Sequence, residues 1–330
     1  MLNVAIVGLG RWGQRLVDAV QTSASAKLRF THAVTRTPDK VREYCSARGL
    51  CVCDDLARVL ADPEVGAVIL ATPHSQHADQ IAAAARTGKH VFVEKPFTLD
   101  AASARAAAQA CRDAGIILAP AHNRRFLPAL AEMKRIVAAG ELGEILHLDG
   151  NFSGRAGLDY RPGMWRATQA ESPAGGMTAM GIHVIDAFIH LAGPVTAVRC
   201  ESQRRVLSVD MDDTTTAFAR FASGATGCIT TLTATGWAFR VQVFGTRGWL
   251  QLLGHQTLEI CDLEGKVRRI EYPQVNIERA ELEAFADAVA GAAAYPVPVE
   301  DAVHGVAVME AAIRSARDGG ERVGVENIRF

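Results

Sequence analysis

The sequence predicts a two-domain α/β protein: a doubly wound parallel sheet, followed by an α+β domain built on a large, mostly antiparallel sheet. The chain has 330 residues, which suits about two domains. Strand-like and helical patterns alternate over the first third, which is typical of parallel βαβ units. From residue 195 onward, short alternating runs follow one another through Gly-containing turns, which indicates antiparallel pairing.

Composition excludes several classes of protein. Lys and Arg number 35 against 36 Asp and Glu, so the chain lacks the basic excess of a general nucleic-acid binder. No apolar run approaches the roughly 18 residues of a membrane helix, and the opening residues do not resemble a secretory signal. The seven cysteines are odd in number and scattered, so neither a disulfide framework nor a metal site is expected. We therefore expect a cytoplasmic protein with no nucleic-acid or membrane partner.

The first predicted strand, residues 2–7, leads into a dinucleotide fingerprint. G-x-G-x-x-G occupies residues 8–13 and a helical pattern follows directly. Gly8 permits a tight turn, Gly10 lets the backbone approach a pyrophosphate, and Gly13 allows close packing of helix on strand. The helix N-terminus offers free N–H groups to the phosphates. The cofactor contacts expected here are Gly8, Gly10, Arg11, Trp12 and Gly13.

The same alternation continues to residue 121 and predicts a Rossmann sheet. Further strands are expected at residues 28–35, 50–53, 65–71, 90–93 and 116–119. Helices are expected at residues 38–48, 56–60, 76–86 and 101–114. Ligands of such sheets lie at the carboxyl ends of the strands. Further cofactor contacts are therefore expected at Thr35, Arg36, Ala71, Thr72, Pro73, His74, His77, Glu94, Lys95, Pro96 and Asn123.

The end of the second strand bears on the choice between NAD and NADP. An acidic residue about 20 positions past the glycines would bind the ribose 2′-hydroxyl and select NAD. This chain has Thr35 and Arg36 there. Thr35 does not repel a 2′-phosphate, and Arg36 can pair with it or stack on adenine. The sequence favours NADP and leaves NAD open.

Two further segments carry residues suited to proton transfer. Lys95 follows a strand in Glu94-Lys95-Pro96, where an ammonium group could lower the pKa of a substrate hydroxyl. His183 and Asp186 are three residues apart in an apolar helical pattern and can share one helix face. A carboxylate beside an imidazole can fix its tautomer. We expect Lys95, His183 and Asp186 to be catalytic, although a lone histidine in such a helix is also typical of a core.

Taken together, the motifs resemble the Gfo/Idh/MocA oxidoreductase family, the relatives of glucose-fructose oxidoreductase and inositol dehydrogenase. The order and spacing match over essentially the whole chain. The motifs are Gly8–Gly13, Ala71-Thr72-Pro73 with His77, Glu94-Lys95-Pro96, Asn123–Pro128, Gly143-Glu144-Ile145 and Gly181–Asp186.

This resemblance implies an NAD(P)-dependent enzyme that acts on sugars, polyols or their derivatives. It implies that Lys95 is the catalytic lysine and His183 the catalytic histidine. It also implies that the open face of the second sheet builds a homodimer or homotetramer. One position departs from the family: many members have Asp where this chain has Ala179. An alanine cannot carry a proton or orient His183, so Asp186, the substrate, or Lys95 and His183 alone must do this work.

The second domain is expected to cover residues 122–330, after a first domain of 1–121. Residues 153–176 form a long loop, and loops of this length are usually functional. An aromatic face can stack on a sugar, and an arginine fork suits a carboxylate or phosphate. The substrate contacts expected are Lys95, Arg124, Trp165, Arg166 and His183. Strands are expected at residues 145–152, 197–203, 214–221, 226–234, 239–244, 249–253, 257–261 and 267–271, and helices at 129–140, 279–289 and 301–317.

The leading hypothesis is a hydride-transfer enzyme that uses a nicotinamide cofactor and a small-molecule substrate. Ala179 motivates an alternative, a non-catalytic NAD(P)-binding regulator, whereas Lys95 and His183 argue for catalysis. An enzyme that holds its cofactor tightly and cycles between two substrates is a third possibility.

Overall fold

The computed structural model describes residues 1–22 and 27–326, which form two compact units. The first unit contains Met1–Thr98, Ala102–Asn123 and Asn276–Val299. The second contains Leu99–Ala101, Arg124–Val275 and the described residues from Glu300 onward. The sequence predicted a single boundary, with residues 1–121 in the first domain and 122–330 in the second. In the structure, Asn276–Val299 also belongs to the first unit.

The first unit is built on a parallel six-stranded sheet with the order β3-β2-β1-β4-β5-β6. This order is that of the dinucleotide-binding Rossmann fold, and it confirms the predicted doubly wound sheet. Its strands are β1 (Leu2–Val7), β2 (Leu28–Val34), β3 (Cys51–Cys53), β4 (Ala67–Leu70), β5 (His90–Glu94) and β6 (Leu118–Ala121). Its helices are α1 (Arg11–Gln21), α2 (Arg42–Arg48), α3 (Leu56–Ala61), α4 (His77–Arg86), α5 (Ala101–Asp113) and α8 (Ile277–Val289).

Helix α8 joins the first unit because its apolar face completes that unit's core. Leu282 and Phe285 are fully buried, and the Phe285 ring lies 5.8 Å from Phe92 of β5. Burying side chains of this size stabilises the fold by roughly 1.5–3 kcal/mol each. A composition-based boundary could not anticipate this return, because a helical pattern does not show which sheet it covers.

The second unit is built on a nine-stranded sheet with the order β14-β13-β12-β11-β7-β10-β9-β8-β15. All its neighbouring strands run antiparallel except β7 and β10, which are parallel. Its strands are β7 (Ile145–Ser153), β8 (Val195–Gln203), β9 (Thr214–Phe221), β10 (Thr226–Leu232), β11 (Ala238–Gly245), β12 (Gly248–Leu253), β13 (Thr257–Cys261), β14 (Val267–Glu271) and β15 (Val323–Gly324). Its helices are α6 (Pro128–Ala138), α7 (Ile182–Ala192) and α9 (Val299–Arg317). The predicted mostly antiparallel sheet is confirmed, and β15 is an edge strand that the sequence did not reveal.

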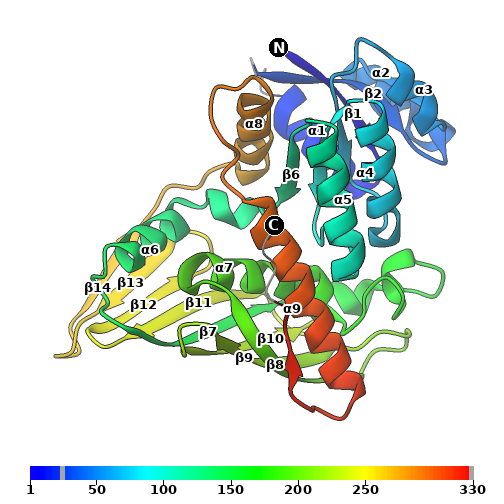
Figure 1. Ribbon diagram of the computed structural model, residues 1–330. Helices are drawn as coiled ribbons and strands as arrows, with labels where there is room; N and C mark the ends of the chain where they lie inside the picture. Colours follow the sequence, from blue (N-terminus) through cyan, green and yellow to red (C-terminus); the bar gives the residue numbers. More distant parts are fainter. Residues whose placement is uncertain (23–26, 327–330) are drawn as a thin grey trace. The chain divides into compact units, whose positions relative to one another are not determined.

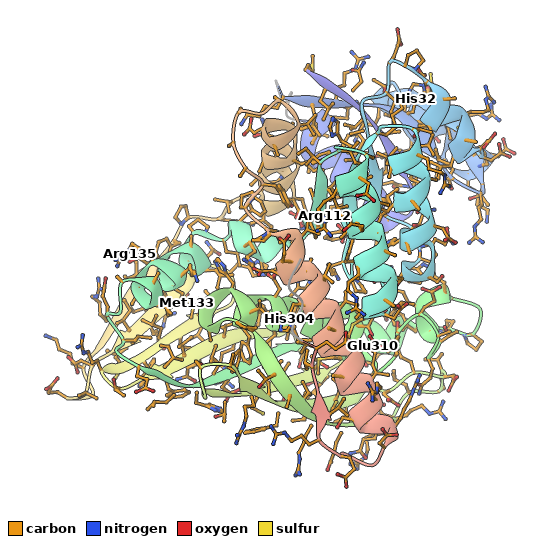
Figure 2. All side chains as sticks on the ribbon, in the orientation of Figure 1. His32, Arg112, Met133, Arg135, His304 and Glu310 are labelled. Atoms are coloured by element: carbon orange, nitrogen blue, oxygen red, sulfur yellow. The ribbon has the colours of Figure 1, made fainter. Side chains whose placement is uncertain are left out.

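Helices cover one face of this sheet. Figure 1 shows α6, α7 and α9 on the same side of the strands. Met133 of α6 is fully buried, whereas Arg135 reaches solvent and pairs with Glu132 (Figure 2). His304 of α9 is buried and its Nε2 accepts a hydrogen bond from the backbone N–H of Val195 at 3.0 Å. Within the described residues, none of the helices combines the length and apolar character needed to span a bilayer.

The segment predicted as a long loop is only partly irregular. It contains the short 3-10 turns Ala156–Asp159 and Trp165–Ala167. It then leads into a π-helical turn, Met177–Gly181, which continues directly into α7. Turns of this kind occur frequently at functional sites.

Candidate active site

The glycine turn after β1 has the shape that a pyrophosphate requires. Gly8 has a φ of +95°, and a Cβ there would lie 2.6 Å from the carbonyl oxygen of Ala71. A Cβ at Gly13 would overlap the carbonyl oxygen of Gly8, so α1 packs directly on the turn. A Cβ at Gly10 would meet nothing within 4 Å, so the backbone faces open space there. The turn lies between β1 and β4, where the strand order reverses and ligands of such sheets bind.

The first turn of α1 contains no acidic residue, so no carboxylate of the helix itself offsets its positive dipole. Trp12 in that turn is held from two sides. Its indole N–H donates to Glu94 Oε1 at 2.5 Å, and the Arg15 guanidinium lies 5.3 Å from its ring centroid. The turn is therefore tied to the end of β5 by a buried carboxylate.

His77 ties together the segments that follow β4 and β5. Its imidazole is fully buried, with Nδ1 3.0 Å from the Pro96 carbonyl oxygen and Nε2 3.2 Å from the Thr72 carbonyl oxygen. The Lys95–Pro96 peptide bond is cis. Lys95 is half-buried. It precedes Pro96, whose carbonyl oxygen contacts His77, so His77 helps to fix the backbone that carries the lysine.

Thr35 and Arg36 follow β2 beside the glycine turn. The backbone N–H of Gly8 donates to the carbonyl oxygen of Val34 at 2.9 Å, which joins the two segments. Thr35 is half-buried and Arg36 is exposed. These two neutral or cationic side chains stand where an NAD-selecting carboxylate would be expected.

In the second unit, His183 lies at the start of α7 and is 2% exposed. Its ring centroid is 5.7 Å from that of Phe152, at the end of β7. The Arg124 guanidinium lies 5.1 Å from the same Phe152 ring. A single aromatic side chain therefore contacts two of the five predicted substrate-binding residues, His183 and Arg124.

Asp186 belongs to a buried ion network that the sequence did not reveal. Arg125 donates to both of its carboxylate oxygens, with Nε 2.9 Å from Oδ2 and Nη2 2.8 Å from Oδ1. Arg125 Nη2 also donates to Asp301 at 2.8 Å, and Nη1 donates to His190 Nδ1 at 2.7 Å. Burial lowers the pKa of Arg125, but the two carboxylates raise it by more. Asp186 is thus the counter-ion of Arg125, and its predicted catalytic role beside His183 stays a prediction.

Trp165 and Arg166 contact each other. The Arg166 guanidinium lies 4.1 Å from the Trp165 ring centroid, within range of a cation–π interaction. The Arg166 carbonyl oxygen accepts a hydrogen bond from Ser172 Oγ at 2.9 Å, which anchors this short turn. The guanidinium of Arg166 therefore lies against the face of the Trp165 ring.

The structure divides the predicted residues between the two units. The first unit holds Gly8, Gly10, Arg11, Trp12, Gly13, Thr35, Arg36, Ala71, Thr72, Pro73, His74, His77, Glu94, Lys95, Pro96 and Asn123. The second holds Arg124, Trp165, Arg166, His183 and Asp186. Sequence reasoning missed Phe152 and Arg125. The inward alternation of 145–152 was a signal for Phe152, but nothing distinguished Arg125 from Arg124 before the fold was known.

The sheet order and the open glycine turn define a dinucleotide-binding protein. Family comparison carries this further. Residues 2–122 match the oxidoreductase family with an NAD-binding Rossmann fold, and residues 130–251 match the C-terminal domain of the Gfo/Idh/MocA group. The chain belongs to the Gfo/Idh/MocA family, as its motifs predicted, and is an NAD(P)-dependent oxidoreductase.

Individual relatives agree with this assignment. Scyllo-inositol 2-dehydrogenase (NAD(+)) of Bacillus subtilis (strain 168) is 32% identical over 96% of this chain and 95% of its own length. Scyllo-inositol 2-dehydrogenase (NADP(+)) IolW of the same organism is 28% identical over 60% of this chain and 53% of its own. Among solved structures, aldose-aldose oxidoreductase from Caulobacter crescentus complexed with glycerol has a TM-score of 0.87 at 26% identity, covering 98% of this chain and 99% of its own.

Proposed function

We propose that this protein transfers a hydride between a nicotinamide and a hydroxyl or carbonyl carbon of a sugar, polyol or related cyclic compound. The observation that carries the proposal is the open glycine turn at the strand-order reversal, with Lys95 on the backbone segment that His77 secures. The relatives, two inositol dehydrogenases and an aldose oxidoreductase, support this substrate class.

In this proposal the side chains of the protein orient the substrate and transfer the proton of its hydroxyl group. A bound nicotinamide supplies the hydride acceptor in oxidation and the hydride donor in reduction. We assign Lys95 and His183 to the reacting oxygen. In oxidation the O–H proton passes to one of them as the C–H electron pair leaves and the carbonyl forms; in reduction the same group returns the proton. Positioned proton transfer of this kind contributes roughly 10²–10⁴-fold to the rate.

Phe152 and Asp186 act as positioning residues in this proposal. Phe152 packs against His183 and limits the orientations of its ring. Asp186 holds α7 to Arg125 through a fully buried ion pair, which fixes the helix that carries His183. Arg124, Trp165 and Arg166 are proposed substrate contacts, because a guanidinium and a flat aromatic face suit polyhydroxylated or acidic rings.

NADP is the proposed preferred cofactor, with NAD as the alternative. Arg36 is exposed, and no described carboxylate forms an ion pair with it, so its guanidinium can meet a 2′-phosphate. NAD and NADP both appear in the names of the relatives.

A second copy of the chain is the proposed partner of the open face of the nine-stranded sheet, giving a homodimer or homotetramer. Thr216 of β9, Thr230 of β10 and Asn151 of β7 lie side by side on this face. A Thr230→Arg substitution should shift the sedimentation coefficient toward that of a single chain. We also propose a cytoplasmic location, since all seven cysteines are free thiols.

The test is an activity screen with NADP⁺ and NAD⁺ against sugars, inositols and other cyclic diols, read from the absorbance of the reduced nicotinamide. Lys95→Met should lower the turnover rate about 10²-fold or more, while cofactor binding persists. Lys40→Met, at an exposed lysine of the same unit, is the matched control. Cofactor binding without turnover on any substrate would instead favour a non-catalytic regulator, the alternative that Ala179 motivates.

A further inference from the structure

The loop between β8 and β9, residues 204–213, packs against the turn Trp165–Ala167. Ala167 forms an apolar cluster with Val209 and Met211 of the loop, and each of the three residues is no more than 4% exposed. The turn carries two of the proposed substrate contacts, so the position of those contacts depends on the conformation of this loop.

Backbone pairing joins the same two segments. Thr168, which directly follows the turn, pairs with Asp210 of the loop in an isolated parallel bridge. Tyr160, which precedes the turn, and Leu207 of the loop both pack against the apolar cluster. Because close-packed side chains transmit strain, a shift in the loop would also displace the turn.

The buried carboxylate of Asp213 holds the loop in this conformation. Its Oδ2 accepts hydrogen bonds from three successive backbone N–H groups, those of Arg205 at 2.9 Å, Val206 at 2.7 Å and Leu207 at 3.0 Å. Its Oδ1 accepts a hydrogen bond from the Thr214 hydroxyl at 2.9 Å. Asp213 stands at one end of the loop and therefore fixes the backbone near the other end.

The negative charge of Asp213 strengthens these hydrogen bonds. Burial raises the pKa of its carboxyl group, but the hydrogen bonds from the three backbone N–H groups and from Thr214 lower it by more. Hydrogen bonds to an ionised acceptor are roughly twice as strong as those between neutral groups. Asp213→Asn keeps the size of the side chain and one acceptor oxygen but removes the charge, so it should loosen the loop without leaving a cavity.

We propose that Asp213 is a positioning residue for substrate binding, which holds loop 204–213 and thereby keeps Trp165–Ala167 in the conformation that contacts the substrate. This inference rests on the proposed function, in which Trp165 and Arg166 contact a polyhydroxylated or acidic ring. The hydrogen bonds of Asp213 lead to the loop and to Thr214. Asp213 therefore acts on substrate affinity, which appears in KM, and leaves the chemical step, which appears in kcat, unchanged.

The first test follows backbone hydrogen exchange by mass spectrometry and needs no substrate. Asp213→Asn should speed exchange about 10-fold or more in peptides that cover residues 164–172, while peptides of α6 and of the first unit exchange like the parent. Asp262→Asn is the matched control, because its exposed carboxylate accepts a backbone hydrogen bond from Lys266 in the turn between β13 and β14. Unchanged exchange at residues 164–172 would overturn the proposal, and so would faster exchange throughout the second unit, which would show general destabilisation.

The second test uses a substrate from the activity screen. Asp213→Asn should raise KM about 10-fold and leave kcat within about 2-fold, whereas Asp262→Asn should match the parent. In a Trp165→Ala background Asp213→Asn should add little, because both changes remove the same contact. A lower kcat at unchanged KM, or effects on KM that multiply, would overturn the proposal. A parent that binds cofactor but turns over no compound would count against the proposed function, and the exchange result would still decide whether Asp213 controls the turn.

Discussion

His190 should make the second unit sensitive to acid. Its Nδ1 accepts a hydrogen bond from Arg125 Nη1 at 2.7 Å, which requires that this nitrogen carry no proton. Burial and the Arg125 charge lower the pKa of His190 from 6.5 to about 4. Protonation in the folded state would break the hydrogen bond and place two cations together.

The sign and size of the effect follow from this pKa. Between pH 6.5 and 4 the unfolded chain binds more protons than the folded chain, so stability is complete above pH 6.5 and falls as the pH falls. Linkage gives about 2 kcal/mol lost between pH 7.5 and 5. The ring is partly exposed, and solvent screening reduces the expected loss to about 1–2 kcal/mol.

Urea unfolding at pH 7.5, 6 and 5 measures this loss, with fluorescence and circular dichroism followed together. His190→Gln keeps an acceptor for Arg125 but does not titrate, so it should lose about 1–2 kcal/mol less than the parent over this range. His147→Gln, whose ring contacts Thr226 instead of Arg125, should behave like the parent. Equal pH dependence in the parent and His190→Gln would refute the reasoning. His304, whose pKa is also lowered by burial, contributes equally to both proteins.

Three further predictions concern the two sites. Gly13→Ala should destabilise the first unit by about 1–3 kcal/mol, because the added Cβ overlaps the Gly8 carbonyl oxygen. Gly10→Ala should fold normally and weaken cofactor binding about 10-fold. Thermal melts compare the stability of the two variants and fluorescence titration compares their cofactor binding; equal melting temperatures would count against this packing. Arg36→Ala should raise the KM for NADP about 10-fold and leave that for NAD nearly unchanged; parallel changes in both would remove the assigned role. Asp186→Asn should cost about 3–5 kcal/mol, because it leaves the buried Arg125 without its main counter-ion; a loss confined to activity would point to proton transfer instead.

Much of the first unit was predictable because its structure is local. Alternating apolar strands and helical patterns place β1, β4 and β5, and short crossovers leave few parallel arrangements open. The glycine spacing predicted the turn because only glycine tolerates the backbone contacts at positions 8 and 13. Family motifs placed Lys95 directly after a strand and His183 in a helix, and in the structure Lys95 follows β5 and His183 lies in α7.

Other features depended on contacts between residues distant in sequence. Asp186 pairs with Arg125, 61 residues away, and Phe152 of β7 packs against His183 of α7. Spacing within a helix shows which side chains share a face, but it does not show what that face meets. Helix α8 and strand β15 illustrate the same limit, since their partners, β5 and β8, lie far back in the chain.

Sequence alone thus determined the type of each sheet, the cofactor turn and the family, because backbone preferences and residue spacing act over a few neighbouring positions. The tertiary structure decided which charges neutralise one another and which remain open. Arg125 is hydrogen-bonded to two carboxylates and a histidine. In contrast, Arg199, Arg220 and Arg322 lie close together and have no counter-ion among the described residues. Such pairing depends on how strands align in space, since electrostatic interaction follows distance and burial instead of order along the chain.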